Sequence, residues 1–158
     1  MKISIIRLPV RSSTIRKRYG DAVGKRIAVV CAAIERGALV LAARRRPRQT
    51  NGGLWEFPGG KVQGGESLTA ALAREVAEEL GVAVSIRHAM EPVEWDYPWV
   101  AIALHPFVCS LNGSAEPEPL DHEELRFVSR DDARILPWAP ADREVVDRYF
   151  QVSGNPPL

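Results

Sequence analysis

Apolar residues in this chain gather in short runs, which are separated by polar segments rich in glycine and proline. Runs with the length and β-branched content of strands cover residues 26–34, 38–43, 82–93, 99–111 and 125–128. Two other segments repeat their apolar residues every three or four positions, which predicts helices over residues 68–80 and 143–150. Strands mixed with two principal helices favour an α/β fold, in which a mixed sheet lies between helices.

The connections between these runs carry turn signals. A hairpin turn, a second turn, a loop and a brief turn are expected at residues 36–37, 98, 112–121 and 131–133. The closing helix is expected to be capped from Pro140 or Asp142.

The segment 68–80 is the clearest helix in the sequence. Its alanine and leucine content favours a helix, Ser67 or Thr69 can start it, and Gly81 is a suitable stop. Its large apolar residues recur at helical spacing and form one stripe, which consists of Leu68, Leu72, Val76 and Leu80. This stripe predicts which face of the helix packs on the sheet.

Three carboxylates crowd one side of the same helix. Glu75, Glu78 and Glu79 are related by three- and four-residue steps, so their side chains are neighbours. Glu75 and Glu79 also border the apolar stripe, where like charges repel one another and lose hydration. A hard divalent cation would compensate them, since all-oxygen carboxylate sites suit Mg²⁺ or Mn²⁺. The alternative is a solvated acidic face with Arg74 as a counter-charge.

The acids belong to a longer pattern that runs from Gly60 to Val82. The pattern specifies ten positions at fixed spacing, which are occupied by its glycines, its glutamates and its Arg-Glu and Glu-Glu pairs. A solvated acidic face requires no such spacing. The stretch resembles the Nudix box, the signature of the Nudix hydrolases. The preceding segment 53–61 resembles the MutT-like branch of that family, and the resemblance covers roughly residues 27–150.

This resemblance implies a Nudix α/β/α sandwich with a mixed sheet and hydrolysis of a nucleoside diphosphate linked to a further group. It implies that Glu75 and Glu79 are the principal metal ligands, with Glu78 as a ligand or as the base that orients water. The carbonyl of Gly59 also corresponds to a metal ligand of the family. The expected cofactor is Mg²⁺, with Mn²⁺ as a possible substitute.

The resemblance also implies supporting roles in the site for four further residues. Arg74 corresponds to the arginine that holds the ligand carboxylates, and Glu66 would support the helix start and the metal-bound waters. An acid from a later loop often completes the metal site in the family. Glu124 and Glu123 are the candidates here, and the spacing does not choose between them.

The arginine run 44–46 supplies candidates for binding phosphate. Arg45 best matches the phosphate-binding arginine of MutT-like members, and Arg46 matches related members nearly as well. Lys61 is a second candidate phosphate contact. At least one of the three arginines is expected to be only a solubilising charge.

Aromatic and acidic residues are candidates for reading the base. Phe57 and Trp138 offer stacking surfaces, although core packing is the default for any single aromatic. Asp142 follows a Pro-Ala pair, as in related pyrophosphatases that act on cytidine nucleotides. An ionised Asp142 only accepts hydrogen bonds, which favours the cytosine amino group or the N7–H of 8-oxoguanine. If Asp142 is only a helix cap, the pocket around Glu56 and Phe57 would have to read the base.

Composition excludes several classes of protein. The chain has 158 residues, the size of one domain, and its net charge of +1 argues against a stable nucleic-acid partner. No apolar stretch has membrane-spanning length, and there is no signal-peptide core. Cys31 and Cys109 lie in apolar runs, as buried thiols of a reducing compartment do, so we expect a cytoplasmic protein.

The two ends of the chain differ from its middle. The first 26 residues hold eight lysines and arginines against one acid, Asp21. We therefore expect a basic leader of weak order or unknown role over residues 1–26, a Nudix domain over 27–151 and a tail over 152–158.

The leading functional hypothesis is a metal-dependent nucleoside triphosphate pyrophosphohydrolase that releases a nucleoside monophosphate and pyrophosphate. Its service would be to cleanse oxidised nucleotides such as 8-oxo-dGTP, and the alternative substrate is CTP or a modified dCTP. A non-catalytic base-reading module is a third hypothesis, against which the retained box carboxylates count. We expect a nucleoside triphosphate as the binding partner, no membrane association, and a monomer or homodimer.

Overall fold

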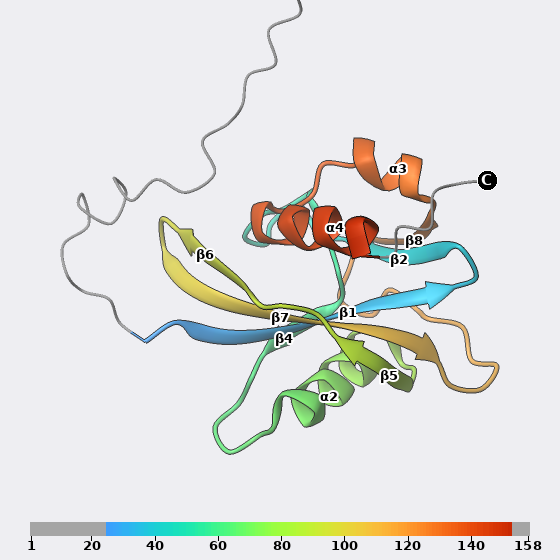
Figure 1. Cartoon of the computed structure of the whole chain (residues 1–158), viewed down its shortest axis with the longest axis horizontal. Coiled ribbons are helices and arrows are strands. Elements are labelled where there is room, and N and C mark those ends of the chain that lie inside the picture. The colour runs from blue at the N-terminus through green and yellow to red at the C-terminus, as the bar shows by residue number, and fades with distance from the viewer. Residues whose placement is uncertain (1–24, 153–158) are drawn as a thin grey trace, which may run out of the picture.

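The computed structural model describes residues 25–152, which form one mixed sheet with helices on both faces (Figure 1). The strands are β1 (Ile27–Arg36), β2 (Leu39–Arg44), β3 (Trp55–Glu56), β4 (Gly59–Lys61), β5 (Val84–Ala89), β6 (Val93–Tyr97), β7 (Val100–Leu111) and β8 (Glu124–Val128). The helices are α2 (Leu68–Leu80), α3 (Arg130–Ile135) and α4 (Pro140–Val152). Apart from residues 25, 26 and 152, the expected leader and tail lie outside the described residues.

Strand β1 is the centre of the sheet. Its apolar run is buried between the helical layers, as a central strand requires, and it pairs in parallel with β7 from Ile27 to Glu35. On its other edge β1 meets two strands in succession. Strand β4 pairs with residues 29–31, and β2 pairs only with Glu35 and Arg36. Strands β2 and β4 therefore share one edge of β1, with the β3 segment between them in the chain.

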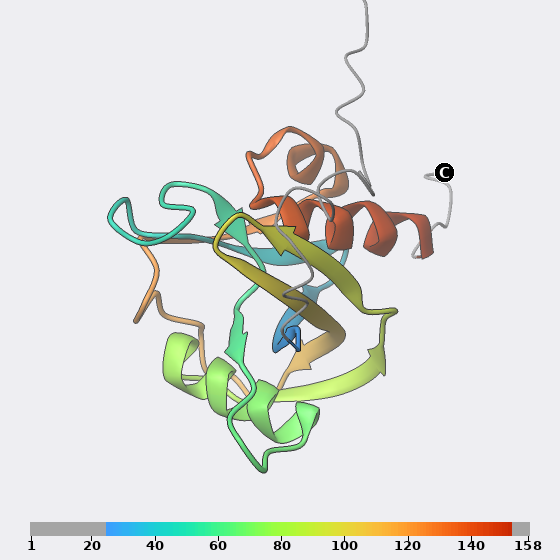
Figure 2. The same cartoon turned by 90° about the vertical axis from the view of Figure 1, so that its left-hand side faces the viewer.

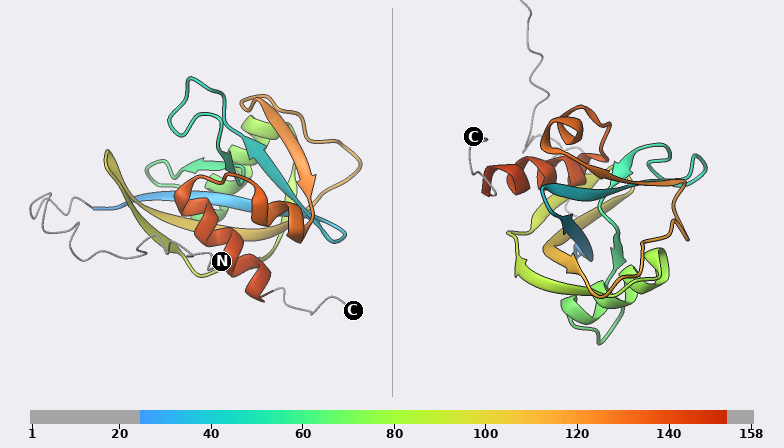
Figure 3. Two further views of the ribbon diagram at one scale, coloured as in Figure 1. Left: turned by 90° about the horizontal axis from the view of Figure 1, so that it is seen from above. Right: turned by 90° about the vertical axis from the view of Figure 1, so that its right-hand side faces the viewer.

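Two helical layers enclose the sheet, as Figures 2 and 3 show. Helix α2 covers one face, where Leu72 and Val76 pack with Val30 of β1. Helices α3 and α4 cover the other face, where Val145 packs with a second core cluster that includes Phe57. This arrangement confirms the α/β/α sandwich, and the α2 stripe faces the sheet as its helical spacing predicts.

The ends of α2 follow from local sequence. Ser67, and not Thr69, is the N-cap, because its hydroxyl accepts a 3.1 Å hydrogen bond from the Ala70 amide. Gly81 ends the helix with φ 67°, a left-handed conformation that glycine adopts without strain, and its amide donates to the Ala77 carbonyl. These two caps fix the ends of α2 and therefore the positions of its acidic side chains.

One strand prediction is wrong. The run 82–93 forms two strands, β5 and β6, and not one. Both pair with β7, but β6 pairs with its first part, residues 100–104, and β5 with residues 107–111. Pro106 lies between these two parts, and its missing amide N–H interrupts the ladder there.

The chain after β8 also differs from its prediction. The brief turn expected at 131–133 is the short helix α3, which Ser129 caps by accepting a 3.2 Å bond from the Asp132 amide. Helix α4 begins at Pro140, so Asp142 lies inside its first turn and is not the capping residue.

Candidate active site

Strand β4 brings its two glycines against the acidic side of α2. The Gly59 amide donates a 3.1 Å hydrogen bond to Oε2 of Glu79. The Glu75 carboxylate lies directly beside Gly60, where any Cβ would collide with it. Because β4 is held by β1 through the pair Gly59 and Cys31, the two carboxylates meet a fixed backbone. A side chain at position 60 would displace the Glu75 carboxylate, whereas position 59 requires glycine because a Cβ there would meet the backbone of β1.

Arg74 holds the outer carboxylates of the site. Its Nε and Nη2 donate to the two oxygens of Glu66 at 2.7 and 2.9 Å, and its Nη1 donates to Glu75 at 2.9 Å and to Glu78 at 3.3 Å. Nη2 also donates to a fourth partner, the Lys61 carbonyl, at 3.0 Å. These hydrogen bonds from Arg74 lower the pKa of Glu66 to about 2, with help from the Gln63 amide. Arg74 therefore balances the negative charges of Glu66, Glu75 and Glu78 without a bound metal.

Glu79 has no such compensation. Its side chain is buried, and the residue is only 8% exposed. Burial raises its pKa to about 9, and the nearby charges of Glu56, Glu75 and Asp121 act in the same direction, against the hydrogen bond from Gly59. A buried acid beside other acids requires either a proton or a bound cation.

The donors around β4 and α2 suit a hard divalent cation. Carboxylate oxygens of Glu75 and Glu79 and the backbone of Gly59 are an all-oxygen set, which Mg²⁺ and Mn²⁺ prefer. Within residues 25–152 no three acidic, histidine or cysteine side chains are gathered closely enough to hold an ion as they stand. Glu75 and Glu78 instead form ion pairs with Arg74, and Glu78 is largely exposed. Both side chains must therefore turn before they can complete a metal site.

The two acids predicted to complete the site face arginines. Glu124 on β8 forms ion pairs with Arg126 at 2.6 Å and with Arg44 at 3.4 Å, and Glu123 lies 3.4 Å from the same Arg44. The acid of this region that acts on Glu79 is Asp121, which the sequence analysis did not select. Its loop is tied to the end of α2 by bonds from the amides of residues 118 and 120 to α2 carbonyls.

The candidate phosphate-binding side chains are engaged by the protein. Arg45 donates from Nη1 to both oxygens of Glu56 at 3.0 Å, and Arg46 donates from Nη2 to the Leu120 carbonyl at 3.1 Å. Lys61 is exposed on β4. Contact of either arginine with phosphate requires an exchange of partners.

The two aromatic candidates lie in the core. Phe57 and Trp138 are both buried, with ring centroids 5.0 Å apart at an interplanar angle of 35°. The Trp138 indole donates to the Ala133 carbonyl at 2.7 Å. The rings therefore pack against each other, and Phe57 meets the site through its backbone amide, which donates to Oδ1 of Asp142 at 2.9 Å.

A buried polar cluster surrounds Asp142. The Tyr97 hydroxyl accepts a bond from the Ala141 amide at 3.1 Å, and Nε2 of His122 lies 2.9 Å from Oε1 of Glu56. Burial, then the charge of Glu56, raises the pKa of Asp142 well above its ordinary value. The expectation of an ionised, acceptor-only Asp142 took no account of this burial. His122 had no signal in the sequence, because its partner Glu56 is distant along the chain.

Comparison with known proteins shows the family to which this chain belongs. The model of the NUDIX domain matches residues 24–149, which include every element of the site. The chain belongs to the Nudix family. Its Nudix fold is also that of solved relatives: the Escherichia coli ORF135 protein, known from a solution structure, superposes with a TM-score of 0.70 at 30% identity, covering 84% of this chain and 94% of that one.

Two curated relatives carry names for their activity. The CTP pyrophosphohydrolase of Escherichia coli is 34% identical over 134 residues, which are 84% of this chain and 98% of the relative. A Mycobacterium tuberculosis protein with the provisional name 8-oxo-dGTP diphosphatase 2 is 41% identical over 116 residues, 73% of this chain and 82% of the relative. This Nudix protein is accordingly a hydrolase of phosphoanhydride bonds.

None of the described helices is long and apolar enough to span a membrane.

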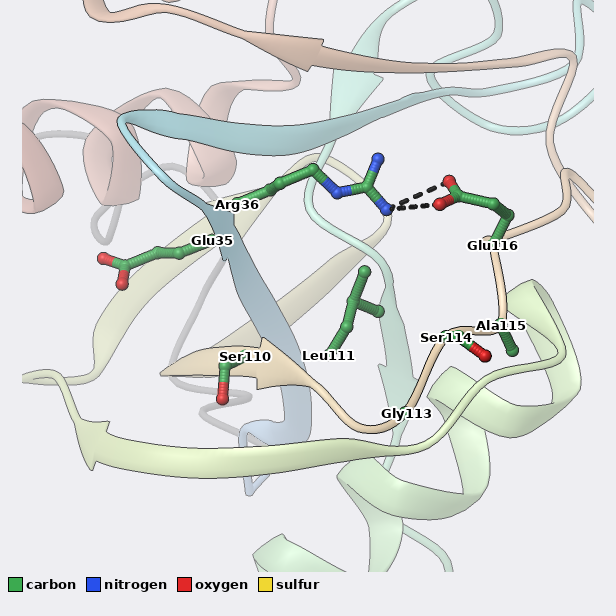
Figure 4. Close-up of a pocket in the computed structure, with 8 residues that line it drawn as sticks. All are labelled: Glu35, Arg36, Ser110, Leu111, Gly113, Ser114, Ala115 and Glu116. Carbon is green, nitrogen blue, oxygen red and sulfur yellow. Dashed lines mark hydrogen bonds and ion pairs between the residues drawn. The ribbon is translucent and has the colours of Figure 1, made fainter.

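A cavity of about 360 Å³ lies at the other end of β1, where the Arg36–Glu116 ion pair lines it together with the loop after β7 (Figure 4). It contains none of the residues that the sequence analysis selected, and it is not the candidate active site.

Proposed function

We propose that this Nudix protein is a Mg²⁺-dependent nucleoside triphosphate pyrophosphohydrolase, which releases a nucleoside monophosphate and pyrophosphate from oxidised nucleotides such as 8-oxo-dGTP. The proposal rests on one observation. Glu75 and Glu79 lie against the β4 glycines, and no cation compensates the buried charge of Glu79. A bound Mg²⁺, or Mn²⁺ in its place, would neutralise phosphate charge and activate water.

In this proposal the acids of α2 have different tasks. Glu75, Glu79 and the carbonyl of Gly59 hold the cation, and Arg74 positions Glu75 while it also contacts the Lys61 carbonyl of β4. Glu78 is the residue for accepting the proton of the attacking water, because it is exposed and is held only by a 3.3 Å contact with Arg74. Glu66 keeps Arg74 in place.

The substrate is proposed to bind where the chain leaves β2. Arg45 and Arg46 are the proposed phosphate contacts, after Arg45 leaves Glu56 or shares it. Lys61, exposed on β4, is a further proposed phosphate contact. The base enters beside Asp142 and the Phe57 backbone, a direction that the polar cluster supports.

A second candidate substrate is CTP or a modified dCTP. It is favoured by the similarity to the Escherichia coli CTP pyrophosphohydrolase, which spans nearly the whole of that relative. Both substrates use the same chemistry, so only the base distinguishes them. The cytoplasm is the proposed compartment, supported by two buried cysteines that form no disulfide.

The test is a panel of triphosphates assayed for pyrophosphate and phosphate release, with Mg²⁺ and with EDTA. We expect pyrophosphate and a monophosphate from 8-oxo-dGTP, more slowly from dGTP, and none without metal. Preference for CTP would select the second substrate. Binding without turnover of any triphosphate would favour a base-reading module and contradict the proposal.

A further inference from the structure

His122 is a buried histidine to which the proposed function gives no task. Its side chain is only 2% exposed, and it lies in the segment between β7 and β8. Its Nε2 is 2.9 Å from Oε1 of Glu56, so this nitrogen carries a hydrogen and donates to the carboxylate. The other ring nitrogen, Nδ1, is buried and has no hydrogen-bond partner among residues 25–152. Within the described part of the chain, Glu56 is therefore the single hydrogen-bond partner of this ring.

A histidine at this place costs stability. The buried Nδ1 loses the hydrogen bond that it makes with water in the unfolded chain, whereas an apolar side chain of similar size would lose none. Glu56 does not need the histidine in the free protein either, because Nη1 of Arg45 donates to both of its oxygens at 3.0 Å. The contact between His122 and Glu56 is therefore best explained by a state in which Arg45 has moved away.

Phosphate binding creates such a state. Arg45 is the proposed phosphate contact, yet in the free protein its guanidinium is directed at Glu56. The Glu56 side chain is only 14% exposed, so water replaces a departing arginine poorly. Its charge also acts on the buried Glu79, which adds to the cost of leaving it without a donor. A second donor to Glu56 removes part of this cost.

We propose that His122 is a positioning residue for substrate binding, which retains Glu56 on β3 so that Arg45 can transfer its guanidinium to the phosphate chain. The inference rests on the proposed function, which supplies the phosphate. His122 and Arg45 donate to the same oxygen, Oε1, so the carboxylate keeps a donor when the arginine leaves. His122 itself makes no contact with the substrate, and the proposed metal ligands are unchanged by the exchange.

The experiment measures the dissociation constant of inorganic triphosphate at saturating Mg²⁺ by calorimetry, together with kcat and KM for 8-oxo-dGTP. His122→Leu removes the donor and keeps the space filled. We expect the dissociation constant and KM to rise about tenfold, because Glu56 would lose its last donor when Arg45 leaves. The value of kcat should stay within about twofold, since only binding is affected. Tm should not fall, because the unpaired buried nitrogen is gone.

His122→Gln tests the donor itself. The glutamine amide nitrogen can take the place of Nε2 and donate to Oε1 of Glu56, so this variant should return both constants to within about twofold of the wild type. The matched control is His88→Leu, which makes the same replacement at an exposed position of β5 and should leave both constants unchanged. Equal constants in His122→Leu and the wild type, or a loss that His122→Gln does not restore, would overturn the inference.

Two double variants isolate the exchange with Arg45. His122→Leu should have no further effect on triphosphate binding in Arg45→Gln, which has no guanidinium to transfer, or in Glu56→Gln, which has no carboxylate to retain. A tenfold effect that persists in Arg45→Gln would contradict the proposal. An equal loss of Mg²⁺ affinity in His122→Leu would contradict it as well, because the histidine would then act through the neighbouring Asp121 and the metal.

A crystal structure of the wild-type protein with Mg²⁺ and inorganic triphosphate covers the case in which His122→Leu does not fold or no nucleotide is hydrolysed. We expect Arg45 on a phosphate oxygen and Oε1 of Glu56 still about 3 Å from Nε2 of His122. Arg45 still paired with both oxygens of Glu56, Glu56 detached from His122, or no bound triphosphate would refute the inference. The expected arrangement without turnover of any nucleotide would refute only the proposed function.

Discussion

The acids of this Nudix protein fall into two groups that the fold treats in opposite ways. In the outer group, Glu66 before α2 and Glu75 within it are neutralised by Arg74, which lowers the pKa of Glu66 to about 2. In the inner group, Glu79 of α2 and Asp142 of α4 are buried near the charge of Glu56, and the pKa of each is raised. The outer group is stabilised by the protein alone. The inner group is left for a ligand to stabilise, whereas Glu75 of the outer group can reach a metal only by turning away from Arg74.

The largest expected effect comes from removing the inner acid of α2. Glu79→Gln keeps the shape of the side chain but removes a proposed metal ligand, so turnover with saturating Mg²⁺ should fall by at least about 100-fold. Steady-state pyrophosphate release measures it. Near-normal turnover would show that α2 is not the catalytic metal site.

The same variant should stabilise the metal-free protein. The pKa of Glu79 rises on folding from 4.5 to about 9, so the folded state keeps a proton that the unfolded state loses above pH 4.5. Stability is therefore lost as pH rises from about 4.5 to 9, by roughly 3 kcal/mol at pH 7. In EDTA, Glu79→Gln should have a higher Tm than the wild type at pH 7 and lack this decline. Glu78→Gln is the matched control, since Glu78 is exposed and should change Tm little.

Metal binding should reverse the pH dependence of the inner group. Because a cation must displace the proton of Glu79, the affinity for Mg²⁺ should increase with pH up to about 9, by at most about tenfold per unit. Calorimetric titration at pH 6, 7 and 8 measures this dependence and the protons released. An affinity independent of pH, with no proton release, would mean that Glu79 is not displaced by the ion.

How much of this contrast the sequence predicts depends on the range of the contacts. The outer group was predictable, because Arg74, Glu75 and Glu78 lie within a single helix, whose spacing makes them neighbours. The cap at Ser67 and the stop at Gly81 are local in the same sense. The α/β/α arrangement followed from the order of the elements and from the Nudix resemblance.

The inner group was not predictable in the same way. The contact between His122 and Glu56 joins residues 66 apart in the chain, and neither has a periodic pattern that points to the other. The burial of Asp142 depends on β3 and β6 meeting the start of α4, which only the folded sheet provides. Local patterns predict local charge pairs, and they miss charges that the tertiary structure isolates.

Replacing Arg74, the arginine of the outer group, should lower turnover less than replacing Glu79 does. Arg74→Ala frees Glu66, Glu75 and Glu78, so the ligands are less well positioned and turnover should fall about 10- to 100-fold. Because the pKa of Glu66 is depressed on folding, its stabilising contribution is present above pH 4.5 and is lost as pH falls towards about 2. Thermal unfolding between pH 2 and 6 should show that loss in the wild type and less of it in Arg74→Ala.

The smallest effect is expected at Glu124, one of the two later acids that were candidates to complete the metal site. Glu124 is already neutralised by Arg126 and Arg44, so it resembles the outer group, and Glu124→Gln should change the Mg²⁺ affinity less than about twofold. Asp121→Asn is the informative companion, because the charge of Asp121 acts on Glu79. Its replacement should weaken Mg²⁺ binding more than Glu124→Gln does, as measured by calorimetry at pH 8. If Glu124→Gln is instead the more damaging change, its arginines must release it when the metal binds, and the division between the two groups would not extend to β8.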